Sequence, residues 1–86
     1  MAKSIFITGA SSGLGKATAL LFSEQGWNVI ATMRKPEAET ELRQHSNISL
    51  FALDVTNLEQ IRETIEKVLK NTSIDVVFNN AGYGLA

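Results

Sequence analysis

Cysteine is absent from the 86-residue sequence, and proline, tryptophan and tyrosine each occur only once. The absence of cysteine excludes a disulfide framework, a thiolate zinc site and an iron–sulfur cluster. No apolar run approaches the ~18 residues that a membrane-spanning helix needs, and the run that follows residue 3 is too short for the core of a signal peptide. We therefore expect a soluble, cytoplasmic protein that does not enter a membrane.

An excess of charge of one sign is also lacking. Eight lysine and arginine residues face nine aspartate and glutamate residues, for a formal net charge of −1. Such a balance does not favour nucleic acid or an anionic membrane as a partner. The remaining composition is that of an ordinary globular protein, with 44% hydrophobic and 20% charged residues. A chain this short buries only about 60–65% of its unfolded surface, so we expect it to be marginally stable alone.

Short β-rich runs alternate along the chain with longer stretches of helical periodicity. Strands are predicted over residues 4–8, 27–33, 48–53 and 74–78. The stretches between them predict a helix that Gly26 ends, a short polar helix from Pro36 to about His45, and a helix after residue 56. This succession predicts an α/β fold with a Rossmann-type, doubly wound parallel sheet of strand order 3-2-1-4. Ligands of such sheets bind at the carboxyl ends of the strands, beside the switch point between strands 1 and 4.

Two local patterns refine the predicted helices. The spacing of apolar residues in the first helix predicts a buried face, which consists of Leu14, Ala17, Leu21 and Phe22. At the start of the last helix, Thr56 and Glu59 match a capping box, in which the threonine caps the helix and the glutamate reaches back to it.

Residues 8–17, which read Thr-Gly-Ala-Ser-Ser-Gly-Leu-Gly-Lys-Ala, carry most of the information about function. A tight strand-to-helix turn needs residues that tolerate a positive φ, and a backbone that contacts phosphate cannot carry side chains there. The helix that begins in this segment presents free N–H groups and the positive end of its dipole, which suits a pyrophosphate. At this point the alternative stays open that the three glycines serve only the tight turn.

Two other chemistries fit parts of the same segment. Residues 9–13 match G-x-S-x-G, the nucleophile elbow of hydrolases, with Ser11 as the nucleophile. That elbow needs an acid and then a histidine downstream, an order that the only histidine, His45, does not fit. Gly15 and Lys16 match the end of a Walker A loop, but alanine stands where the magnesium-binding hydroxyl should be. Both alternatives are disfavoured, and Lys16 is interpreted as a solvated helix residue.

Thr-Gly-x-x-x-Gly-x-Gly directly after an N-terminal strand resembles the cofactor signature of the short-chain dehydrogenase/reductase family. Gly9, Gly13 and Gly15 follow the spacing of that family and not the usual G-x-G-x-x-G. The similarity extends over all 86 residues, because Asp54-Val55 after the third strand and Asn79-Asn80-Ala81-Gly82 after the fourth match two further family motifs. The resemblance implies hydride transfer between a nicotinamide dinucleotide and a small-molecule carbonyl or alcohol substrate.

The resemblance also implies which residues bind the cofactor. They come from the ends of the four strands and are Gly9, Ser11, Ser12, Gly13, Leu14, Gly15, Arg34, Asp54, Val55, Asn80, Ala81 and Gly82. In similar family members the aspartate accepts a hydrogen bond from the adenine amino group, and the backbone of the next residue contacts the ring. Alternatively, Asp54 only begins the turn that precedes the last helix. Asn80 is implied to tie the central sheet together, and the small residues 81 and 82 to let the backbone approach the nicotinamide ribose.

The choice between NAD and NADP depends on the residues just past the second strand. An NAD enzyme typically has an acid there, which accepts from the ribose 2′-hydroxyl. This sequence has no acid before Glu37, and Arg34 lies where a guanidinium can make a forked contact with a 2′-phosphate. We therefore predict that NADP (NADPH) is preferred and that NAD is possible. The alternative is that Arg34 and Lys35 are a solvated basic pair.

The resemblance places the catalytic serine, tyrosine and lysine outside these 86 residues. The proton donor of the family is the tyrosine of Y-x-x-x-K, and the lysine position that Tyr83 would need is residue 87. We interpret residues 1–86 as the N-terminal part of a single dinucleotide-binding domain, inactive alone, whose complete protein is a homo-oligomer. No metal is implied. The competing interpretation is a non-catalytic dinucleotide-binding or sensing module with the same fold.

Overall fold

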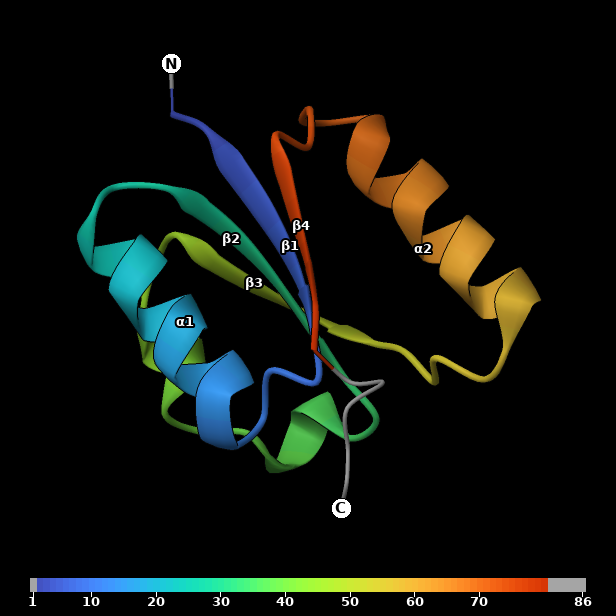
Figure 1. Cartoon of the computed structure of the whole chain (residues 1–86), viewed down its shortest axis with the longest axis horizontal. Helices are drawn as coiled ribbons and strands as arrows, with labels where there is room; N and C mark the ends of the chain where they lie inside the picture. Colours follow the sequence, from blue (N-terminus) through green and yellow to red (C-terminus); the bar gives the residue numbers. More distant parts are fainter. Residues whose placement is uncertain (1, 81–86) are drawn as a thin grey trace.

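The computed structural model describes residues 2–80 (Figure 1). Along the chain, the strands and the two longer helices are β1 (Ser4–Thr8), α1 (Gly13–Glu24), β2 (Asn28–Met33), β3 (Ile48–Ala52), α2 (Leu58–Leu69) and β4 (Val76–Asn79). All neighbouring strands pair in parallel, and their order is β3-β2-β1-β4. The predicted α/β fold and strand order are therefore confirmed. None of the helices in this described part is long and apolar enough to cross a membrane.

The sheet is covered on both faces, and β1 shows why its sequence is apolar throughout. Ile5 and Ile7 belong to the core cluster that includes Ala19 of α1. Phe6 belongs to a second cluster, on the other face, that includes Val68 of α2. Because successive side chains of a strand point to opposite faces, α1 and α2 lie on opposite sides of the sheet, as Figure 1 shows.

The buried face of α1 differs from the predicted one. Its buried residues are Gly15, Ala19 and Ser23. Of the predicted face, only Phe22 packs against the core, whereas Ala17 is exposed and Leu14 and Leu21 are 65% and 53% exposed. The prediction was wrong for the other three residues, because apolar periodicity takes no account of how closely the helix approaches the sheet. Against the sheet, α1 presents its smallest residues, which bring the helix backbone close to the end of β1.

The end of α1 is a Schellman motif, as its glycine predicted. Gly26 has φ +86° and donates its N–H to Ser23 O at 3.1 Å, and Trp27 N–H reaches Phe22 O at 3.0 Å. The rings of Phe22 and Trp27 pack edge to face with centroids 4.9 Å apart. These contacts fix the direction in which the chain enters β2.

Gly26→Ala is expected to lower the free energy of unfolding by about 1–2 kcal/mol, because a left-handed backbone is unfavourable for a residue with a side chain. An added Cβ would meet no atom within 4 Å, so backbone strain is the only cost. Chemical denaturation measures the change. Gly26→Asn is the matched control and should lose less, since asparagine tolerates this conformation; equal losses for both variants would contradict the explanation.

Two other local predictions need correction. The short polar helix predicted from Pro36 to His45 is two separate 3-10 helices, η1 (Pro36–Ala38) and η2 (Leu42–Gln44). Asn57, and not Thr56, caps α2, since Asn57 Oδ1 accepts the Gln60 N–H at 3.0 Å. α2 begins at Leu58, so Thr56 lies one residue before the N-cap position, and its hydroxyl donates to Asp54 Oδ1 at 2.7 Å.

α2 covers its face of the sheet only in part. An apolar groove of about 350 Å³ remains between α2 and the strands, and its lining includes Phe6, Ile65 and Val77. β4 forms one edge of the described sheet, and Val76 and Val77 are 40% and 63% exposed. An exposed apolar edge strand promotes self-association.

Candidate functional site

The carboxyl end of β1 turns sharply into α1, and glycines make both bends. Gly9 has φ +66° and Gly13 has φ +59°, the conformation for which glycine is favoured. Between them, Ala10 is fully buried and donates its N–H to Thr32 O at 3.0 Å, whereas Ser11 and Ser12 are exposed. The turn is thus anchored to β2 at one point and presents the next residues outward.

The N-terminus of α1 has features of an anion-binding helix end. Ser12 is the N-cap residue and makes no side-chain capping hydrogen bond, and the first turn contains no acid. The first helical hydrogen bond runs from Lys16 N–H to Ser12 O at 3.3 Å. The N–H groups of residues 13–15 precede that bond, so they lack an acceptor within the helix and add to the positive end of its dipole. No atom lies within 4 Å of a Cβ placed on Gly13, so the backbone is open to a ligand here.

Gly15 is required by contact between backbones. A Cβ at this position would lie 2.2 Å from Gly9 O and 2.8 Å from Asn80 Nδ2. Asn80 itself joins β4 to the turn, because its Nδ2 donates to Gly9 O at 3.2 Å and its N–H donates to Thr8 Oγ1 at 2.9 Å. The end of β1, the end of β4 and the first turn of α1 therefore form one closely packed unit, and Asn80 has the structural position that the resemblance implied.

Arg34 and Asp54 lie just past the carboxyl ends of the neighbouring strands β2 and β3. Arg34 Nη2 lies 4.0 Å from Asp54 Oδ1, and the two side chains are 74% and 46% exposed. An exposed pair at this distance adds little to stability. A ligand that offers the guanidinium a better acceptor therefore meets little resistance from Asp54.

The Asp54 carboxylate also starts the turn before α2, as the alternative interpretation had it. Its Oδ1 accepts from the Thr56 hydroxyl at 2.7 Å and from the Thr56 N–H at 3.0 Å. These two hydrogen bonds, in that order, and the nearby Arg34 charge hold the pKa of Asp54 below its usual value. Both bonds use Oδ1, so they leave Oδ2 available, and the turn is compatible with the predicted contact to adenine. Val55, the next residue, is half-buried and lines the apolar groove.

Lys16 is not the solvated residue that the sequence suggested. Its Nζ lies 3.3 Å from Glu39 Oε2 and 3.1 Å from Glu41 Oε1, and its side chain is only 26% exposed. The hydrogen bond to Glu41 is the largest cause of a raised Lys16 pKa. Sequence reasoning missed this cluster because its acids come from an irregular segment more than twenty residues away.

Two of the predicted cofactor-binding positions, Ala81 and Gly82, lie outside the described residues, as does Tyr83. Within residues 2–80, no group of three or more histidine and acidic side chains is arranged to hold a metal ion. The other predicted cofactor-binding residues all lie at the carboxyl ends of the strands or in the segments that directly follow them.

Similar proteins were found by sequence and by structure. A 3-ketodihydrosphingosine reductase of Bacteroides thetaiotaomicron is 42% identical over 82 residues, which are 94% of this chain and 29% of that protein. The 3-oxoacyl-(acyl-carrier-protein) reductase FabG of Thermotoga maritima is 42% identical over 86 residues, with 93% of this chain and 35% of that protein covered. The structure of ElxO with NADP bound superposes with a TM-score of 0.87 at 39% identity, over 100% of this chain and 37% of ElxO.

The chain thus spans about a third of the length of the relatives that it matches. Residues 3–86 match the family described as short chain dehydrogenase, which is nearly the whole sequence. The glycine turn, the parallel sheet order and the closely packed end of β4 agree with that match. The chain therefore belongs to the short-chain dehydrogenase family.

Proposed function

We propose that this chain forms the cofactor-binding part of a longer, NADP-preferring oxidoreductase. The observation that carries the proposal is that three features meet at the carboxyl ends of the strands. They are the open helix end after β1, the exposed guanidinium of Arg34 after β2, and the carboxylate of Asp54 after β3. Family membership favours this function over a nucleophile elbow or a Walker A loop. The relatives' printed names describe reductases, which supports a carbonyl as the substrate group.

The described residues fit the adenine, the 2′-phosphate and the diphosphate of a dinucleotide. The N–H groups of residues 13–15 and the open side of Gly13 would hold the diphosphate. Arg34 would bind a 2′-phosphate, and Asp54 Oδ2 would accept from the adenine amino group. When bound, the nicotinamide supplies the hydride, and the protein supplies position and polarity.

A second candidate is a module of the same fold that binds the dinucleotide without catalysis. This candidate fits the same observations, because the features that support the proposal concern the cofactor and not the reacting groups. The two candidates share every residue of the site discussed above. They differ only in whether the complete protein turns over substrate. The expected cytoplasmic location and homo-oligomeric state stay predictions.

Titration of the complete protein with NADPH and NADH tests the proposal. NADPH is expected to bind about 10- to 150-fold more tightly, since one charge-assisted hydrogen bond contributes about 1.5–3 kcal/mol. With a panel of ketones and aldehydes, the complete protein should oxidise NADPH, and residues 1–86 alone should not. Failure to bind either nucleotide would refute the proposal. Tight binding without turnover of any carbonyl would favour the non-catalytic module.

A further inference from the structure

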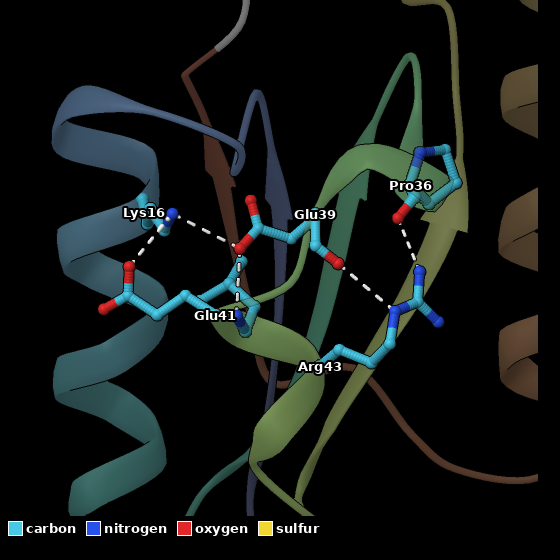
Figure 2. Close-up of polar contacts among 6 residues, drawn as sticks. Lys16, Pro36, Glu39, Glu41 and Arg43 are labelled. Carbon is cyan, nitrogen blue, oxygen red and sulfur yellow. Dashed lines mark hydrogen bonds and ion pairs between the residues drawn. The ribbon is translucent and has the colours of Figure 1, made fainter.

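The segment that follows Arg34 is fastened to α1 through Lys16 (Figure 2). The Lys16 ammonium contacts two carboxylates of this segment, Glu39 at 3.3 Å and Glu41 at 3.1 Å. We call these three residues the Lys16 cluster. Lys16 directly follows Gly15 in the first turn of α1, so the cluster connects the phosphate-binding helix end with the segment that leaves β2.

Glu39 is the central residue of the cluster, because its side chain is only 5% exposed. Its Oε2 accepts the Leu42 N–H at 2.9 Å and also faces Lys16 Nζ. Burial raises the pKa of this carboxyl. The hydrogen bond from the Leu42 N–H and the Lys16 ammonium lower it by more, so the pKa of Glu39 lies below its ordinary value. A charged carboxylate is buried here only because both partners are present.

The same segment is also held together internally, by hydrogen bonds from Arg43. Arg43 Nε donates to Glu39 O at 3.2 Å, and the Arg43 guanidinium also donates to Pro36 O, as Figure 2 shows. Leu42 is fully buried in the core cluster on the α1 side of the sheet. Pro36, which begins this unit, is separated from Arg34 only by Lys35. The backbone of Arg34 is therefore fixed between buried Met33 at the end of β2 and a unit that the Lys16 cluster anchors.

We propose that the Lys16 cluster is a positioning device for Arg34 and thereby helps to determine the preference for a 2′-phosphorylated cofactor. The inference rests on the proposed function, because it requires that Arg34 face the 2′-phosphate. Lys16 acts through Glu39 and Glu41 and not by contact with the cofactor: two carboxylates already engage its ammonium. A forked contact depends on orientation, so displacement of the segment costs NADPH affinity and leaves NADH affinity largely unchanged.

Glu39→Gln in the complete protein distinguishes positioning from simple electrostatics. Removal of a negative charge near the 2′-phosphate would by itself raise NADPH affinity, whereas loss of positioning lowers it. The matched control is Glu37→Gln, which makes the same charge change on an exposed side chain of the same segment. Relative to this control, Glu39→Gln is expected to lower the NADPH-to-NADH affinity ratio by about 3- to 10-fold.

Two more variants complete the test. Lys16→Arg keeps a cation within reach of both acids and should preserve the ratio within about 2-fold. If Glu39→Gln lowers the folded fraction seen by circular dichroism, Glu41→Gln takes its place, since the Glu41 side chain is 58% exposed and its loss leaves no buried group unpaired. An affinity ratio that is unchanged or raised in the folded variant, relative to Glu37→Gln, overturns the inference. Failure of the unmodified protein to bind either nucleotide would instead overturn the proposed function.

Discussion

Gly15→Ala in the complete protein is expected to lower NADPH affinity by about 10- to 150-fold and to destabilise the fold by about 3 kcal/mol. The added Cβ would lie 2.2 Å from Gly9 O, which is backbone and cannot rotate away as a side chain could. Relief of this overlap requires α1 to move away from the end of β1. The N–H groups of residues 13–15 move with the helix, so the proposed diphosphate site loses its geometry.

The affinity for NADPH can be measured by fluorescence titration, and stability by chemical denaturation of the same samples. Gly26→Ala is the matched control, because it also adds one methyl group to a glycine at an end of α1 but meets no atom within 4 Å. That control should lose stability and keep its NADPH affinity. If Gly15→Ala binds NADPH as tightly as the unmodified protein, the turn after β1 does not hold the diphosphate.

The features that the sequence predicted well are those that depend on short segments. The positive φ angles of Gly9, Gly13 and Gly26 and the apolar run of β1 follow from local backbone preferences and from burial on both faces. Once the strand order is known, the proximity of Arg34 and Asp54 follows too, because they come one and two residues after the neighbouring parallel strands β2 and β3.

The features that the sequence did not predict depend on contacts between distant segments. The close approach of α1 to the sheet selects small residues such as Ala19 for burial, so the buried face differs from the one that apolar periodicity favours. The start of α2 lies one residue later than the pattern predicted, so that Asn57 caps the helix and Thr56 joins the turn that Asp54 begins. The Lys16 cluster joins a helix to an irregular segment between β2 and β3, and no periodicity indicates which of its acids turns inward.

Arg34→Asp is expected to lower the NADPH-to-NADH affinity ratio of the complete protein. Loss of the charge-assisted hydrogen bond alone should lower the ratio by about 10- to 150-fold. The new carboxylate repels a 2′-phosphate and accepts from a 2′-hydroxyl, so NADPH weakens while NADH gains a contact. Titration of both nucleotides gives the ratio, and the ratio of kcat/KM values gives an independent check. An unchanged ratio would show that Arg34 does not face the 2′-phosphate.

Lys35→Asp is the matched control for charge, since it makes the same change on the adjacent exposed residue. If general electrostatics determined the preference, both variants would shift the ratio alike; if a forked contact determines it, Lys35→Asp shifts the ratio far less.

Arg34→Lys separates charge from geometry, because lysine keeps the cation but not the planar pair of donors, so its ratio should lie between those of the unmodified protein and Arg34→Asp. The pair with Asp54 does not obscure these results, because at 4.0 Å and with Arg34 74% exposed it contributes little that Arg34 must give up to reach a phosphate. The ordering of the three variants therefore reports on contact with the cofactor and not on a lost surface ion pair.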